Sequence, residues 1–161
     1  MLHQRIRAVT ERTGTAMRHC TAMQEASGFY AGLRADMERA AVRIMAQLEH
    51  DISVEGEEFL EQLKPRTRVD LFLFYKECLV NISRHSGATQ FSTRLRAGPR
   101  EIHLAVRDNG HGIGESRGNG IPSSLKRRAR LLGARVAVES PVTGGTCITL
   151  KLRTQRWGRR K

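Results

Sequence analysis

The most constraining feature of this sequence is a strand pattern that ends in an acid and is followed by evenly spaced glycines. Residues 102–107 alternate between branched aliphatic and other side chains, which predicts a strand with one buried face that delivers Asp108 to the end of a sheet. An ionised carboxylate only accepts hydrogen bonds, so Asp108 would pair with the exocyclic amine of adenine and repel the carbonyl of guanine. Glycine stands at every second position of 110–114, and its freedom at positive φ would let this loop curl beneath a flat base. The stretch therefore indicates a nucleotide pocket.

The same residues also fit a simpler interpretation. Asp-Asn-Gly is a common turn sequence, because Asp and Asn side chains bond their own backbone and Gly adopts the left-handed region. Residues 108–110 alone leave both interpretations open.

Length and composition favour one globular domain with a short appendage. The 161 residues, 39% of them hydrophobic, suffice to bury a core. No apolar run approaches about 20 residues and no charged-then-apolar leader opens the chain, so we expect no membrane span or signal peptide in this segment and a cytoplasmic location. Cys20, Cys78 and Cys147 lie far apart without a Cys-x-x-Cys pair, which predicts reduced thiols rather than disulfides or a zinc site.

The formal net charge of +12 is compatible with nucleic-acid binding through phosphate attraction. Aromatic residues, however, make up only 5% of the chain, and no basic patch is interleaved with the stacking rings that single-strand binders use. Much of the charge lies at Lys126–Arg130 and Arg153–Lys161, which we interpret as a solvated helix face and a basic tail. We therefore expect no specific nucleic-acid partner.

The first part of the chain reads as helical. Residues 1 to about 48 carry apolar side chains at helical spacing, with a break at Ser27-Gly28 and a looser pattern before it. His3 and His19 lie in the looser part. Either could accept a phosphoryl group, but neither is followed by an acidic residue, and a lone helical histidine is more often a bystander.

A strong helix is predicted in the middle of the chain. A short strand at 52–54 and an acidic connector at 55–61 precede it, and Pro65 closes the connector. Residues 67–70 have the form of a capping box, which predicts a helix that begins there and ends at Gly87.

This helix has two distinct faces. Its apolar residues recur at helical spacing and should meet the sheet: Phe72, Tyr75, Leu79 and Ile82. Four polar residues converge on another face: Glu77, Asn81, Arg84 and His85. Taken alone, the polar face fits a solvated surface better than a site.

Two hairpins and a further helix complete the pattern. The alternating segments pair as 90–96 with 100–107 and as 135–139 with 147–153. Between the hairpins lie a glycine-rich segment at 110–120 and a helix from about Ser123 to Leu132 that Gly133 stops. This order predicts an α+β fold, a two-layer α/β sandwich in which helices cover one face of a mixed sheet.

Three groups of residues occur in an order that is far more specific than any one of them. They are Glu77-x-x-x-Asn81-x-x-Arg84-His85, Asp108-x-Gly110-x-Gly112, and Gly118-x-Gly120 followed by Gly144-Gly145-Thr146. Over residues 50–153 the combination resembles the ATP-binding domain shared by sensor histidine kinases, gyrase-type topoisomerases and related ATPases, in which these are the N, D and G boxes. Residues 74–88 and 131–146 look closest to bacterial two-component kinases related to nitrate and nitrite sensors.

The resemblance implies a role for each residue. Asn81 would supply its side-chain oxygen to Mg²⁺, and Arg84 and His85 would face the triphosphate of ATP. Asp108 would hold the adenine amine, with help from Thr146. The glycines would shape the site, with Gly110 and Gly112 around the base and Gly118 and Gly120 in a lid over the phosphates. The helix that follows would offer backbone N–H groups to the anion.

The reaction that the resemblance implies is transfer of the ATP γ-phosphoryl to a histidine on a dimerisation helix and then to an aspartate of a response regulator receiver domain. Glu77 would be a candidate base, which activates water in hydrolytic relatives and would polarise or position groups in a kinase. The sequence departs from the family in two respects. The lid end at 120–125 is one residue longer and has serine where glycine is common, and the phosphoacceptor motif, a histidine followed by Asp or Glu on a dimerisation helix, is absent.

These departures suggest a piece of a longer kinase. We interpret residues 1–28 as a remnant of the second dimerisation helix and linker, 29–153 as the ATP-binding catalytic domain and 154–161 as a basic tail. The histidine-bearing helix would lie upstream, in a parent protein that an inner membrane could anchor. The chain would then bind ATP without phosphorylating itself.

Three other functions stay open. A stand-alone serine kinase of the anti-sigma-factor type has the same ATP site on a similarly short chain. A nucleotide-binding module that has lost turnover would fit the altered lid. A basic nucleic-acid binder would show salt-dependent DNA affinity that Asp108→Asn leaves unchanged.

Overall fold

The computed structural model describes residues 32–112 and 120–154. The chain divides into two compact units, Met1–Gly32 and Leu33–Lys161, and every element below lies in the second. The expectations for His3, His19, Gly118 and most of the basic tail fall outside the described residues. None of the described helices combines the length and the apolar character that a membrane crossing requires.

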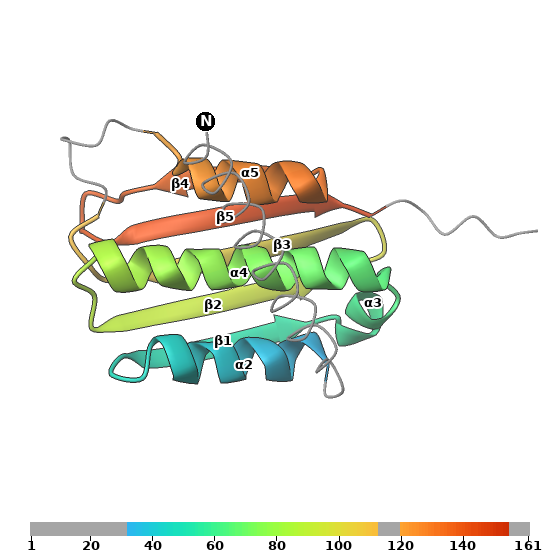
Figure 1. Cartoon of the computed structure of the whole chain (residues 1–161), viewed down its shortest axis with the longest axis horizontal. Helices are drawn as coiled ribbons and strands as arrows, with labels where there is room; N and C mark the ends of the chain where they lie inside the picture. Colours follow the sequence, from blue (N-terminus) through green and yellow to red (C-terminus); the bar gives the residue numbers. More distant parts are fainter. Residues whose placement is uncertain (1–31, 113–119, 155–161) are drawn as a thin grey trace, which may run out of the picture. The chain divides into compact units, whose positions relative to one another are not determined.

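A five-stranded mixed sheet is the framework of the second unit (Figure 1). The elements follow in the order α2 (Leu33–Ile44), β1 (Glu49–Glu55), α3 (Glu57–Glu61), α4 (Pro65–His85), β2 (Gln90–Ala97), β3 (Glu101–Asp108), α5 (Ser123–Leu132), β4 (Arg135–Glu139) and β5 (Thr146–Arg153). The strand order is β1-β2-β3-β5-β4, with β1 parallel to β2 and the other pairs antiparallel. Helices α2, α4 and α5 lie over one face of the sheet (Figure 1). The predicted α+β sandwich is confirmed.

The core lies between the sheet and these helices. On β3 the predicted inward residues, Ile102, Leu104 and Val106, are at most 1% exposed. The apolar face of α4 meets them, and its four predicted residues are all buried: Phe72, Tyr75, Leu79 and Ile82. Side chains on the other face of β2 and β3 are mostly polar and exposed, as expected for a sheet with one solvated side.

Helix α4 begins two residues before the predicted capping box. Pro65 starts the helix and Lys64 precedes it without a side-chain cap, because proline lacks the N–H that would be unpaired there and its fixed φ suits the first turn. The prediction of a cap at 67–70 is therefore wrong. The helix ends at His85, and Gly87 adopts a φ of 59° just beyond it.

The segment before α4 is less helical than predicted. Among the described residues before β1, the helix covers only Leu33–Ile44, and the chain turns at 45–48. Strand β1 has seven residues instead of the short strand expected at 52–54, because the parallel pairing with β2 extends its length. The acidic connector contains the short helix α3.

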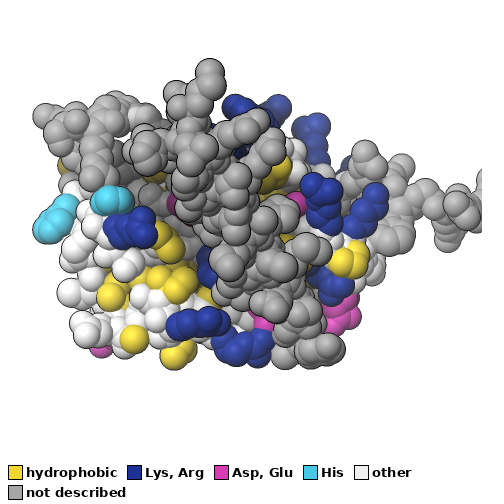
Figure 2. Space-filling model, viewed as in Figure 1, with side chains coloured by type: hydrophobic (Ala, Val, Ile, Leu, Met, Phe, Trp, Pro, Cys, Tyr) yellow, Lys and Arg dark blue, Asp and Glu magenta, His cyan; other side chains and the backbone are white. Residues whose placement is uncertain are grey.

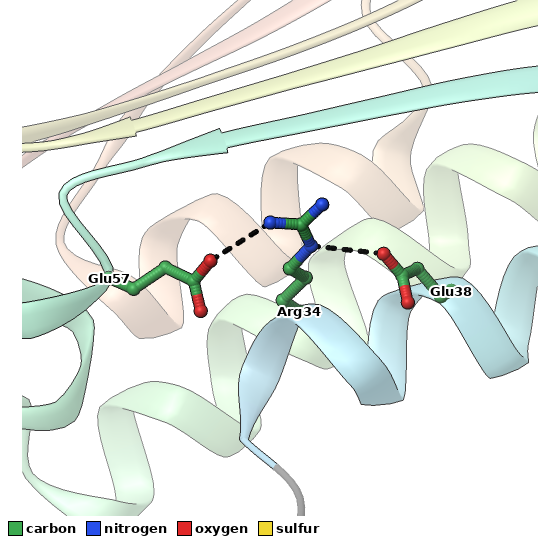
Figure 3. Close-up of polar contacts among 3 residues, drawn as sticks. All are labelled: Arg34, Glu38 and Glu57. Carbon is green, nitrogen blue, oxygen red and sulfur yellow. Dashed lines mark hydrogen bonds and ion pairs between the residues drawn. The ribbon is translucent and has the colours of Figure 1, made fainter.

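Arg34 forms two ion pairs, one with Glu38 within α2 and one with Glu57 of α3 (Figure 3). Its Nε lies 3.0 Å from Glu38 and its Nη1 lies 3.0 Å from Glu57. All three side chains are 44–50% exposed, so solvent and salt screen these pairs and we assign them little of the stability. The buried interface of the helices with the sheet must therefore supply most of it.

Tyr75→Phe tests the buried polar contact at the centre of this interface. The Tyr75 hydroxyl lies 3.2 Å from Thr93 Oγ1, and both residues are fully buried. Burial raises the pKa of Tyr75 to about 12, whereas an unfolded tyrosine ionises near pH 10. The contribution of Tyr75 to stability is therefore complete below about pH 10 and is lost as the pH rises toward about 12.

We expect the variant to unfold about 1–3 kcal/mol more easily at about pH 8, since it leaves Thr93 without its partner. This difference in the free energy of unfolding should narrow or reverse near pH 11.5, because only the wild type has a buried phenol to ionise at this position. Urea unfolding followed by circular dichroism at both pH values measures it. A gap that stays constant would contradict the burial of the phenol.

Candidate functional site

A cavity of about 570 Å³ opens at the end of the sandwich where α4 ends and α5 begins, on the left of Figure 1. Ligand pockets for small molecules have volumes of about 300–1,000 Å³, so the space suits a nucleotide-sized molecule. Its lining comes from five parts of the chain: Asn81, Ile82, His85 and Ser86; Asp108 and Gly112; Gly120 to Leu125; Val138; and Thr146 and Ile148.

Asp108 is the buried acid of this cavity. It is the last residue of β3, on the helix-covered side of the sheet, and is 4% exposed. The Gly110 N–H donates to its Oδ1 at 2.8 Å, and the Thr146 N–H also donates to the carboxyl group. Burial raises the pKa of Asp108, and these two donors offset part of that rise. The side chain is thus a fixed acceptor with limited access to water.

Asn81 and Glu77 act as one unit on the last turns of α4. The Asn81 Nδ2 donates to the Glu77 backbone carbonyl at 2.7 Å and to its Oε1 at 3.3 Å. These bonds fix the amide, and among the described residues no group donates to Asn81 Oδ1. Asn81 lines the cavity whereas Glu77 does not. The geometry therefore presents an amide oxygen to the cavity, with Glu77 as its support.

Two histidines, His85 and His111, lie near the end of α4. His85 is exposed and lines the cavity, whereas Arg84 is exposed but does not line it. The ring of His111 covers Gly87, since a Cβ on that glycine would lie 2.6 Å from His111 Nε2. Figure 2 shows histidine side chains at the left edge of this face, beside the end of α4.

Two glycines allow the strand ends to converge. A Cβ on Gly110 would lie 2.1 Å from the Ser86 carbonyl oxygen, and one on Gly145 would lie 2.1 Å from the Asp108 carbonyl oxygen. The Gly145 N–H also donates to the Gly110 carbonyl at 2.8 Å. Because a side chain at either position would collide with backbone, these glycines set how closely β3, β5 and the end of α4 approach one another.

The start of α5 forms the wall opposite α4. Ser123, Ser124 and Leu125 line the cavity, and Pro122 at the N-cap position makes no side-chain hydrogen bond. The first N–H groups of this helix therefore have no capping side chain, and together with the helix dipole they favour an anionic group at this end of the cavity.

Helix α5 also carries four positively charged side chains. Lys126, Arg127 and Arg130 are exposed and Arg128 is half-buried. Among the ion pairs of the described residues, none includes these four side chains. Figure 2 shows Lys and Arg side chains gathered over this helix, in the upper part of the view. The α5 side of the cavity is thus positive, whereas the acid among the described lining residues is Asp108.

The structure brings most of the predicted site residues together. Six of them line the cavity: Asn81, His85, Asp108, Gly112, Gly120 and Thr146. Three described ones do not: Glu77, Arg84 and Gly110.

The apolar walls contain Ile82, Ile121, Leu125, Val138 and Ile148. Ile121 and Leu125 belong to the predicted lid end at 120–125, whereas the other three were not predicted as part of a site. Val138 and Ile148 are paired in the register of β4 and β5, so the inward alternation of that hairpin was a usable signal for them. Ser86 gave no comparable signal, whereas Ser123 and Ser124 lie in the predicted lid end.

The fold matches solved structures, although no protein-family model and no curated protein matches the sequence. The histidine kinase domain of the Erythrobacter litoralis blue-light activated histidine kinase EL346 gives a TM-score of 0.58 at 20% identity, over 75% of this chain and 60% of that one. A longer EL346 structure gives 0.65 at 19% identity, over 88% and 49%. The ATP binding domain of PrrB from Mycobacterium tuberculosis gives 0.55 at 21% identity, over 76% and 92%.

These similarities establish the fold. The chain has the α+β architecture of histidine kinase ATP-binding domains, which confirms the predicted fold type. It spans about half to three fifths of the two EL346 structures and most of the PrrB domain.

Asp108→Asn should separate stability from binding. Because burial raises the pKa of Asp108, its stability contribution is complete below the ordinary aspartate pKa of about 3.9 and is lost as the pH rises through the higher folded value. Near pH 7 the melting temperature of the variant should therefore be no lower than that of the wild type, and any increase in melting temperature should vanish toward pH 3.5.

Adenine nucleotide affinity near pH 7 should nevertheless fall roughly 10- to 100-fold, since a hydrogen bond to a charged group contributes about 1.5–3 kcal/mol. Melting curves and calorimetric titration measure the two effects. An unchanged affinity in the variant would show that Asp108 does not hold the base.

Proposed function

We propose that this chain is the ATP-binding catalytic part of a two-component sensor histidine kinase, of the branch related to nitrate and nitrite sensors. The observation that carries the proposal is one cavity with a buried acceptor, Asp108, at the strand end, the amide oxygen of Asn81 on α4 and the uncapped start of α5 opposite. These three groups are complementary to an adenine amine, a magnesium ion and a polyphosphate. The sequence pattern at 74–88 and 131–146 supports the branch.

The base would lie against the apolar walls with its amine toward Asp108. The carboxylate offers only acceptors, so adenine gains a hydrogen bond where guanine would present a second acceptor. Thr146, whose N–H already orients the carboxyl group, would assist through its hydroxyl. Discrimination between the two bases then rests on one buried group.

Magnesium would be held jointly with the nucleotide. The described residues contain no group of three or more His, Cys, Asp or Glu side chains that could hold a metal ion alone. Asn81, with its Nδ2 engaged by Glu77, fits a single oxygen ligand, and Mg²⁺ commonly takes one or two protein oxygens and completes its shell with phosphates and water. When bound, the ion neutralises phosphate charge.

The phosphoryl step requires positioning more than covalent work by this chain. A ring nitrogen of a histidine on a dimerisation helix would attack the γ-phosphorus, forming the P–N bond as the bond to the β,γ-bridging oxygen breaks and ADP leaves. His85 and the α5 start would place the phosphates, and Glu77 would hold Asn81 rather than contact the substrate. The phosphoryl group would then pass to an aspartate of a response regulator.

Asn81→Ala should remove the magnesium dependence of nucleotide binding. Calorimetric titration with ATP and GTP, with and without Mg²⁺, measures it. The wild type should prefer ATP to GTP and should bind ATP about tenfold more tightly with Mg²⁺, a difference of about 1.4 kcal/mol. In the variant the magnesium effect should disappear while the base preference stays.

Ser83→Ala is a matched control, because Ser83 is exposed on the same helix two residues away. It should behave as the wild type. Magnesium dependence that survives in Asn81→Ala would contradict the assigned metal ligand.

Transfer is tested by adding a histidine-bearing dimerisation segment of a related kinase in trans with labelled ATP. We expect acid-labile label on the added segment and none on this chain alone, with Asp108→Asn reducing the rate in step with affinity. Acid-stable label on a serine would favour the anti-sigma-factor type of kinase. Tight ATP binding without any transfer would favour a binding module.

A further inference from the structure

We infer that Asn109 is a positioning residue, which fixes the end of α4 relative to Asp108 and so sets the spacing between the two ends of the nucleotide. This inference rests on the proposed function, because it concerns how the same cavity holds ATP. Asn109 itself is exposed and does not line that cavity. Any effect it has on the nucleotide must therefore act through other residues.

The side chain of Asn109 clamps the loop between α4 and β2. Its Oδ1 accepts from the backbone N–H of Thr89 at 2.9 Å and from that of Gln90 at 3.0 Å. Its Nδ2 donates to Thr89 Oγ1 at 2.9 Å. The Asn109 backbone N–H also donates to the Gln90 carbonyl at 3.2 Å. These four hydrogen bonds to Thr89 and Gln90 come from one residue, which follows Asp108 directly in the sequence.

A second attachment lies two residues further along. The His111 N–H donates to the Ser86 carbonyl at 2.8 Å, directly after the helix turn that carries His85. Gly110, between the two attachments, packs against the same carbonyl with no room for a Cβ. Residues 109–111 thus grip both sides of the loop at 86–90.

The clamp spans the two functional ends of the cavity. Asp108, on one side of it, is the acceptor for the base, and Asn81 and His85 on the last turns of α4 lie at the phosphate end. Because ATP is one molecule, both ends must fit it at once. A small shift of one end of the cavity relative to the other therefore weakens the binding of the whole nucleotide more than the binding of a ligand that uses only one end.

The alternative is that Asn109 only stabilises a turn. That role predicts an unchanged ratio of Mg·ATP affinity to adenosine affinity, since it alters the folded fraction without changing the geometry of the folded site. The positioning role predicts that a ligand that uses one end of the cavity is spared. Adenosine, which reaches only the base end, and Mg·ATP, which reaches both, distinguish the two roles.

The test compares the affinities of the full chain for adenosine and for Mg·ATP, by calorimetry and competition, under conditions where melting curves show each variant folded. In Asn109→Ala we expect adenosine affinity to stay within about twofold of the wild type and Mg·ATP affinity to fall by about tenfold or more, as for a misplaced binding group. In Asn109→Asp the ratio of Mg·ATP affinity to adenosine affinity should lie within about threefold of the wild-type ratio. The aspartate carboxylate can still accept from the backbone N–H groups of Thr89 and Gln90, and the Thr89 hydroxyl can turn to donate to it.

Two further variants keep the test decisive. Gln90→Ala removes the bond from Gln90 Nε2 to Glu49 (2.7 Å) in the same corner, and it should leave the ratio unchanged. Thr89→Val removes only the bond to Asn109 Nδ2 and should lower the ratio by a smaller factor, which gives a readout if Asn109→Ala does not fold.

An unchanged ratio of Mg·ATP affinity to adenosine affinity in Asn109→Ala or Thr89→Val, or a ratio that Asn109→Asp fails to restore, would overturn the positioning role while leaving the proposed function intact. A wild type that binds neither ligand would instead reject the proposed function.

Discussion

The site depends on the close approach of three backbone segments at one corner of the sheet. The end of β3 contacts the turn after α4 through Gly110 and Ser86, and it contacts the start of β5 through Asp108 and Gly145. In both contacts a backbone carbonyl occupies the space that a side chain on the glycine would need. Hydrogen bonds from Gly145 to Gly110 and from His111 to Ser86 close the same corner. This packing places a strand-end carboxylate and a helix-end amide around one cavity, although they come from distant parts of the sequence.

The electrostatics of the cavity follow from this arrangement. At the strand end, Asp108 is buried and its pKa is raised, so the fold accepts a local loss of stability to keep an acceptor out of water. At the other end, within the described part of the chain, no acid forms an ion pair with the cations of α5 at 126–130, and the start of that helix has no capping side chain. A ligand with a neutral amine at one end and several negative charges at the other fits this polarity, which is why ATP is the ligand that we propose.

Local patterns in the sequence predicted the sheet and the main helix well. The alternation of apolar and polar residues predicted β3 correctly, because one face of that strand is buried. The 3.6-residue spacing of apolar residues predicted the buried face of α4, including Tyr75 and Leu79. The predicted start of α4 was wrong, because the helix begins at Pro65, two residues before the capping pattern. The pairing of Asn81 with Glu77 follows from their spacing of four on a helix. The contact of Gly110 with Ser86 could not be predicted, because it depends on how two segments 24 residues apart pack in space.

The most direct test of the central claim is the map of backbone amide shifts in the ¹⁵N-labelled chain on addition of a non-hydrolysable Mg·ATP analogue. The account predicts that the largest changes fall together on Gly112, Thr146 and Ser124, which come from three separate parts of the chain and meet only at this cavity. Asp108→Asn should remove the changes at the strand end at the same ligand concentration. Changes confined to the solvated face of the sheet, around Arg94 and Lys151, or no saturable change at all, would contradict it.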